Sequence, residues 1–172
     1  MHEYAITVIG HDRPGIIAEV TTVLADLGLN LSDSTMTLLR GHFAMTLICA
    51  GDVQAAAVEG ALRPLTEGGS LKVSVREVAA ESAPAPRGGS HVLSLHGADR
   101  LGIVAAVTRV LAGEGGNITD LTTRLASGLY VLLAEVDLPP SADLAAINAR
   151  LRGVANELGV EVSLRSADPD VL

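Results

Sequence analysis

The sequence predicts an α+β protein built from two tandem copies of one small unit, in which an antiparallel sheet carries both helices on one face. Two observations lead to this prediction. A shift of 87 residues aligns the two halves of the 172-residue chain without a gap, and 14 of the 24 residues in 10–33 recur in 97–120. Each half also shows the same order of alternating and helical hydrophobic patterns.

Each unit is expected to begin with a strand and a helix. Hydrophobic residues alternate with polar ones in 6–8 and again in 93–95, which predicts a half-buried strand. In residues 16–27 they recur every three or four positions, which predicts a helix with one buried face. Gly28 then stands where a helix-ending glycine belongs.

A hairpin is expected to follow the first helix. Two alternating segments flank Arg40 and Gly41, and the second half repeats this arrangement around Ser127 and Gly128. Alternating hydrophobic residues on both sides of a short glycine-containing connection are typical of two antiparallel strands. The third and fourth elements are therefore paired strands.

A second helix and a last strand complete each unit. The helix is clearest in 144–158, where hydrophobic residues step by three and four behind Ser141, the expected N-cap. Alternating residues in 71–75 and 160–164 predict the closing strands. The order strand-helix-strand-strand-helix-strand is the split βαβ, ferredoxin-like arrangement.

The boundaries of the units follow from composition. We predict a first unit over 1–78, a linker of Pro, Gly and small residues over 79–90, a second unit over 91–165 and a frayed tail over 166–172. Units this small bury modest cores. We therefore expect the two halves to pack as a pseudo-symmetric pair.

Composition argues against direct nucleic-acid binding. Twelve basic and twenty acidic residues give a net charge of −8, which repels phosphate backbones. Aromatic residues make up 2% of the chain and there is no Trp, so few side chains are available to stack on bases. The single cysteine, Cys49, lies in a hydrophobic segment and is expected to be a core thiol.

Other function classes lack a signal in the sequence. The first residues do not read as a secretory signal, and no apolar run reaches the length of a membrane span, so we expect a cytoplasmic protein away from membranes. The five histidines are scattered without metal-ligand spacing, and neither a phosphate loop nor a dinucleotide fingerprint occurs. We therefore expect no metal and no cofactor.

The candidate site is the glycine-flanked turn between the first strand and the first helix, 10–16, which recurs at 97–103. Free backbone amides and the helix dipole at such a position favour a carboxylate or another anion. An amino acid ligand also needs partners for its ammonium group. The candidates are Asp12, Asp99, Asn30 and Asn117.

A purely structural interpretation of these residues stands beside the functional one. Asp12 and Asp99 could cap the helix, and Arg13 and Arg100 could brace the turn. Asn30 could be present because it tolerates a left-handed backbone after Gly28. Spacing alone does not decide between the two.

The Asp-Arg-Pro-Gly-Ile turn of 12–16, the Gly28-x-Asn30 step and the hydrophobic helix between them resemble the ACT domain family. These are small ferredoxin-like modules that bind amino acids and regulate metabolism. Two such units cover nearly the whole chain, and the arrangement is most similar to the glycine cleavage system transcriptional repressor group. The residues implied as ligand-binding are His11, Asp12, Arg13, Pro14, Gly15, Asn30, Asp99, Arg100, Gly102 and Asn117.

The resemblance implies a regulator and not an enzyme. It implies a small amino acid as effector at an interface between units, and a homo-oligomer is compatible with it. The acidic charge favours action through contact with a protein, such as a DNA-binding transcriptional activator. One alternative is a relative of formyltetrahydrofolate deformylase, an enzyme whose first module carries a similar turn. The other is an interaction scaffold with decayed ligand sites, because Ala98 and Leu101 depart from the first turn's pattern.

Overall fold

A computed structural model of the protein describes residues 1–79 and 89–167. The chain divides into two compact units, Met1–Ser82 and Ala83–Leu172, and each is described by itself. Most of the expected linker and most of the expected tail lie outside the described residues.

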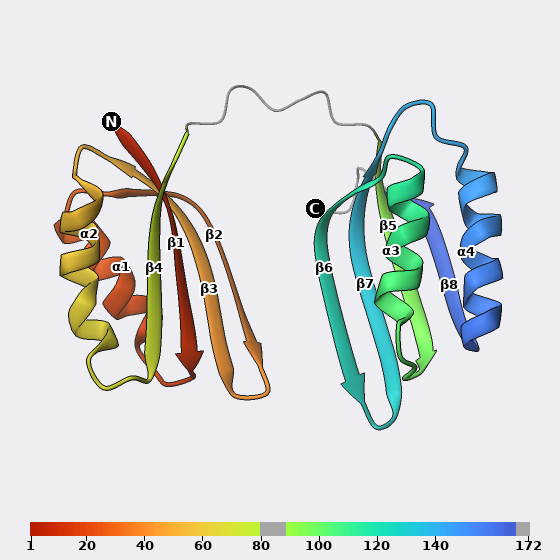
Figure 1. Ribbon diagram of the computed structural model, residues 1–172, viewed down its shortest axis with the longest axis horizontal. Coiled ribbons are helices and arrows are strands. Elements are labelled where there is room, and N and C mark those ends of the chain that lie inside the picture. Colours follow the sequence, from red (N-terminus) through yellow and green to blue (C-terminus); the bar gives the residue numbers. More distant parts are fainter. Residues whose placement is uncertain (80–88, 168–172) are drawn as a thin grey trace. The chain divides into compact units, whose positions relative to one another are not determined.

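Unit 1 is a four-stranded antiparallel sheet in the order β2-β3-β1-β4. Its two α-helices lie on one face of the sheet (Figure 1). The elements are β1 (His2–His11), α1 (Ile16–Asp26), β2 (Asn30–Leu39), β3 (His42–Gly51), α2 (Ala55–Leu62), a 3-10 turn (Arg63–Thr66) and β4 (Leu71–Val78).

Unit 2 repeats this topology with the strand order β6-β7-β5-β8. Its first strand begins at Gly89, inside the segment expected to be linker. The elements are β5 (Gly89–Ala98), α3 (Ile103–Gly113), β6 (Asn117–Ala126), β7 (Leu129–Leu138), α4 (Leu144–Leu158) and β8 (Val160–Ser166). The predicted fold of two ferredoxin-like units is confirmed.

The hairpins turn through residues with left-handed backbone. Arg40 and Gly41 have φ angles of 51° and 82°, and Ser127 and Gly128 have 52° and 82°. Two consecutive positive φ angles define the tight turn whose twist matches that of the flanking strands. The glycines in these connections are therefore explained by the turn.

The N-cap of α4 is Asp143 and not Ser141, so that part of the prediction is wrong. The Asp143 carboxylate accepts hydrogen bonds from the amides of Ala145, at 2.9 Å, and Ala146, at 3.0 Å. Both residue types are good caps. The helix begins at Leu144, and the carboxylate of the residue directly before it satisfies the free amides.

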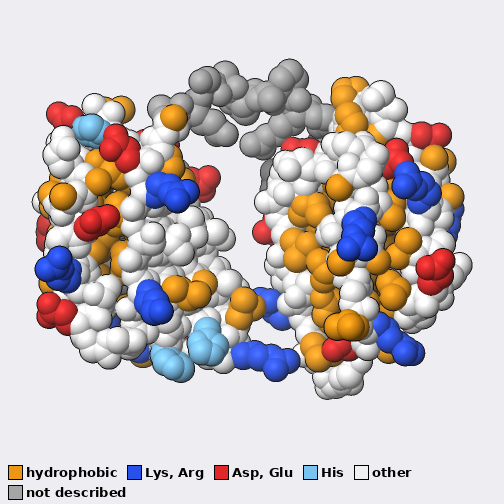
Figure 2. Space-filling model, viewed as in Figure 1, with side chains coloured by type: hydrophobic (Ala, Val, Ile, Leu, Met, Phe, Trp, Pro, Cys, Tyr) orange, Lys and Arg blue, Asp and Glu red, His pale blue; other side chains and the backbone are white. Residues whose placement is uncertain are grey.

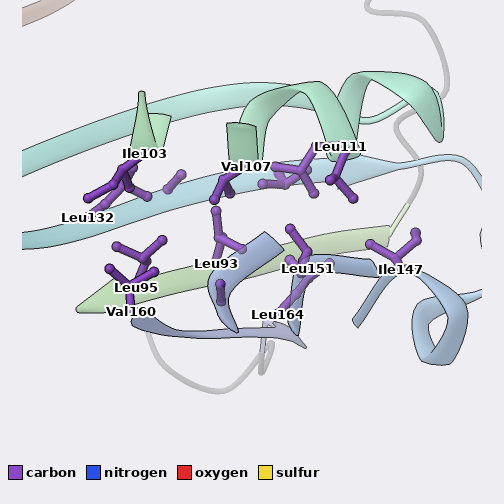
Figure 3. Packing of buried hydrophobic residues seen from close by; sticks show 14 of the residues in the cluster. Leu93, Leu95, Ile103, Val107, Leu111, Leu132, Ile147, Leu151, Val160 and Leu164 are labelled. Carbon is purple, nitrogen blue, oxygen red and sulfur yellow. The ribbon is translucent and has the colours of Figure 1, made fainter. Parts of the chain in front are cut away.

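Each unit has its own hydrophobic core between the sheet and the helices. In unit 1 the alternating residues Tyr4, Ile6 and Val8 of β1 are fully buried. In unit 2 the inward side chains of β5 and β7 meet those of α3 and α4, with Leu93, Leu132 and Leu151 among the fully buried residues (Figure 3).

Cys49 belongs to the core of unit 1. Its side chain is fully buried, and burial raises the pKa of the thiol above its ordinary value. A thiol with a raised pKa in an apolar environment is a poor nucleophile. The prediction of a core thiol is confirmed.

The edge strands β2 and β6 extend beyond the cover of the helices. Nearly all of their residues are exposed, including Met36, Leu38, Leu121 and Leu125. Hydrophobic side chains accordingly reach the surface of both units (Figure 2). The side of β2 that faces the helices forms one wall of the pocket described next.

Candidate functional site

The turn between β1 and α1 is held by backbone contacts. The amide of Asp12 donates to the carbonyl of Gly41, at 3.0 Å, which ties the turn to the β2–β3 hairpin. Gly15 is the N-cap of α1 and has a φ of 91°, a conformation that favours glycine. Gly102 repeats this at the start of α3 with a φ of 86°.

Both helices begin without a side chain that caps them. Neither Gly15 nor Gly102 offers a side-chain acceptor, and no side-chain cap bond is formed. The first amides of α1 and α3 have no acceptor within their own helix, because the i−4 carbonyl does not exist there. Together with the helix dipole they form a donor site for an anion.

A pocket of about 440 Å³ lies beside the start of α1. This volume falls in the range of small-molecule sites. The turn supplies its polar side, and hydrophobic side chains of α1, β2 and β3 supply the rest. The lining residues are Asp12, Arg13, Gly15, Ile16, Ile17, Ala18, Met36 and Phe43.

Arg13 is engaged by Glu19 of α1. Its two terminal nitrogens donate to the two carboxylate oxygens of Glu19, each at 2.6 Å. These hydrogen bonds lower the pKa of Glu19 and raise the pKa of Arg13 from their ordinary values. The positive charge at the first turn is therefore matched by a negative one.

Unit 2 has an equivalent pocket, also of about 440 Å³, beside the start of α3. Leu101, which replaces Pro14, is fully exposed, and Tyr130 replaces Phe43. The lining residues are Asp99, Arg100, Leu101, Gly102, Ile103, Val104, Ala105 and Tyr130.

The structure therefore brings together some of the predicted site residues within each unit. Asp12, Arg13 and Gly15 line the first pocket, and Asp99, Arg100 and Gly102 line the second. Two further predicted residues of the first turn do not line its pocket, namely Pro14, which is exposed, and His11. His11 lies opposite His42 across the sheet, with the two rings 5.1 Å apart.

The two predicted asparagines lie at the other end of each sheet. Gly10 pairs with Phe43 of β3, whereas Asn30 pairs with Ala50, seven positions further along. At about 3.3 Å per residue this separation is roughly 23 Å. Asn117 is displaced from the second turn in the same way, because it pairs with Asp137 and Gly97 pairs with Tyr130. Neither asparagine lines the turn pocket of its own unit.

The structure also tests the purely structural interpretation of Asp12, Asp99, Asn30 and Arg13. The N-caps are glycines, so Asp12 and Asp99 do not cap the helices. Asn30 is not among the residues with positive φ, so a left-handed backbone does not explain it. Arg13 does brace the first turn, through Glu19.

Sequence reasoning missed the walls of the first pocket and the partner of Arg13. Met36 and Phe43 come from strands that the register brings beside the turn. Glu19 could have been noticed as one of the positions where the repeat fails, because Ala106 stands at the equivalent place.

No group of three or more His, Cys, Asp or Glu side chains suited to a metal ion occurs in 1–79 and 89–167. Within the same residues, no helix is long and apolar enough to cross a membrane.

Comparison with known proteins agrees with the architecture. Over 95% of its length the chain is 26% identical to the glycine cleavage system transcriptional repressor of Escherichia coli, 89% of which is covered. A UPF0237 protein of Methanocaldococcus jannaschii is 35% identical over 78 residues, which are 45% of this chain and 87% of that protein.

Solved structures share the fold over nearly the whole chain. A protein of Galdieria sulphuraria matches 97% of this chain and 99% of its own, with a TM-score of 0.77 and 28% identity. The crystal structure of a candidate glycine cleavage system transcriptional repressor covers 97% of this chain and 98% of its own, with a TM-score of 0.74 and 20% identity. This similarity supports the fold. The ACT domain model matches residues 3–76 and 91–165, so the chain belongs to the ACT domain family, with one copy in each unit.

Proposed function

We propose that this protein is a regulator that binds a small amino acid at its turn pockets and acts by contact with another protein. The observation that carries the proposal is the pocket beside each uncapped helix start, which both units form from equivalent residues. Membership of the ACT domain family and similarity to a transcriptional repressor support the regulatory role.

The chemistry of the first pocket suits an amino acid. The α-carboxylate would accept hydrogen bonds from the free amides of Ile16 and Ile17, at the positive end of the α1 dipole. The carboxylate of Asp12 lines the same pocket and is an acceptor for the ammonium group. Hydrophobic walls from Met36 and Phe43 would enclose a small side chain.

Filling the pocket should abolish binding there. Ala18 is exposed and lines the pocket, so Ala18→Trp would place an indole where the ligand is proposed to lie. We expect the affinity of the best amino acid, chosen by thermal shift among the twenty, to fall more than tenfold in calorimetry. Because the changed side chain is at the surface, stability should change by less than about 0.5 kcal/mol.

Ala25→Trp is the matched control, since Ala25 is also exposed and lies two turns further along α1, away from the pocket. Its affinity should equal that of the wild type. An unchanged affinity in Asn30→Ala would remove Asn30 from the site, because Asn30 is remote from the turn of its own unit. A tenfold loss in Asn30→Ala would instead place that side chain at the ligand, and equal affinity in Ala18→Trp and wild type would exclude the pocket.

The mode of action is tested separately. With a net charge of −8, the purified protein should not retard DNA in a mobility-shift assay at physiological salt. In a pull-down, retention of a DNA-binding transcriptional activator should change when the amino acid is added, since a ligand acts by favouring one state over another. Sequence-specific retardation of DNA by the protein alone would contradict the proposal.

A further inference from the structure

We infer that the two turn pockets select ligands by charge: the first takes a ligand whose charges cancel, and the second takes one that carries an additional carboxylate or other anionic group. The inference rests on the proposed function, in that small ligands bind at the turns. It assigns a different ligand class to each turn and names the position that causes the difference.

In the first pocket the arginine is already neutralised. Arg13 and Glu19 form two parallel hydrogen bonds of 2.6 Å, the fork geometry in which a guanidinium and a carboxylate match best. Both side chains are about two-fifths exposed, so the pair lies at the surface and not in the core, and of the two only Arg13 lines the pocket. An additional carboxylate on a ligand would have to compete with Glu19 for Arg13.

In the second pocket the equivalent arginine has no such partner. Arg100 corresponds to Arg13, but Ala106 stands where Glu19 would be. Within the part of the chain that the structure describes, Arg100 takes part in no ion pair. Each pocket has one adjacent carboxylate, Asp12 in the first and Asp99 in the second, so these residues do not distinguish the pockets.

One further substitution makes the second pocket more polar. Tyr130 stands in place of Phe43 and adds a phenolic hydroxyl that can donate a hydrogen bond. The second pocket therefore offers an arginine that takes part in no ion pair among the described residues, and one added hydroxyl group.

The difference between the pockets should be large enough to measure. Guanidinium–carboxylate hydrogen bonds are charge-assisted, and two can form side by side. Losing one such bond typically weakens binding by about tenfold or more. Ala106→Glu should therefore give the second pocket the ligand preference of the first, and Glu19→Ala should give the first pocket that of the second.

The experiment compares L-alanine with L-aspartate, which differ by one carboxylate, by calorimetry on the full chain. Ala18→Trp or Ala105→Trp blocks one pocket so that the other is measured alone, since both alanines line their pockets. At the second pocket we expect L-aspartate to bind at least tenfold more tightly than L-alanine, and Ala106→Glu to remove that preference. At the first pocket we expect L-alanine to be preferred, and Glu19→Ala to raise the affinity for L-aspartate.

Ala112→Glu is the matched control, because it changes the net charge equally at an exposed position in the last turn of α3. Succinate, which lacks an ammonium group, separates the inferred charge selection from the proposed binding of amino acids. Equal affinities of L-alanine and L-aspartate at the second pocket, unchanged by Ala106→Glu, would overturn the inference and leave the proposed function in place.

Succinate binding that Ala106→Glu abolishes, without binding of any amino acid, would support the charge selection and overturn the proposed function. Absence of heat with every probe would overturn both.

Discussion

Gly10→Ala is expected to lower the free energy of unfolding of unit 1 by about 3 kcal/mol or more, because the added methyl group has no room. A Cβ atom there would lie 2.0 Å from the carbonyl oxygen of Ser70 and 2.9 Å from the Cα of Leu71. These are backbone atoms of the entry into β4. The Ser70 carbonyl also accepts the amide of His11, at 3.1 Å, so moving it away would break this hydrogen bond between the end of β1 and the entry into β4.

Hydrogen exchange measured by mass spectrometry would show this loss as faster exchange in β1 and β4. Gly60→Ala is the control, since Gly60 lies inside α2 with no atom within 4 Å of the added methyl group. That change should stabilise the unit by up to about 1 kcal/mol, because alanine is the better helix former. Equal protection in Gly10→Ala and wild type would refute the proposed close approach of β4.

Leu132→Ala is expected to destabilise unit 2 by about 2–5 kcal/mol. Leu132 is fully buried beside Ile103, where the start of α3 meets the inner face of the sheet (Figure 3). Truncation removes its packing contacts and leaves a cavity in surroundings that relax only in part. Urea denaturation followed by circular dichroism would measure the loss as a lower midpoint.

The next residue provides a control of the same chemical change. Leu133 points to the opposite face of β7 and is 49% exposed. Leu133→Ala should therefore cost less than about 1 kcal/mol, as expected for a partly solvated side chain. Similar costs at the two positions would show that the face assigned to the core is wrong.

The elements were predictable because hydrophobic spacing and glycine placement act locally. Alternation in β1 and the helical period in α1 depend on neighbours within a few positions. The N-cap of α4 was misplaced because two good caps, Ser141 and Asp143, lie two residues apart. Only the path of the backbone decides which of them meets the free amides.

The candidate site was predictable only in part, because it combines a local turn with remote strands. Residues of the turn, such as Asp12 and Gly15, are neighbours in sequence and line the pocket together. Asn30 follows the end of α1, whereas the pocket lies at its start, and the pairing of β2 with β3 keeps these ends apart. Phe43 joins the pocket through register, which the local pattern does not specify.

The place of β1 in the middle of its sheet affects how unit 1 forms during translation. The strand that is made first pairs on one side with β3 and on the other with β4, the last strand of the unit. Until Leu71–Val78 has left the ribosome, one edge of β1 has no partner, and closure must wait for a contact across nearly the whole unit. Unit 1 is therefore expected to complete its sheet while the ribosome is synthesising unit 2.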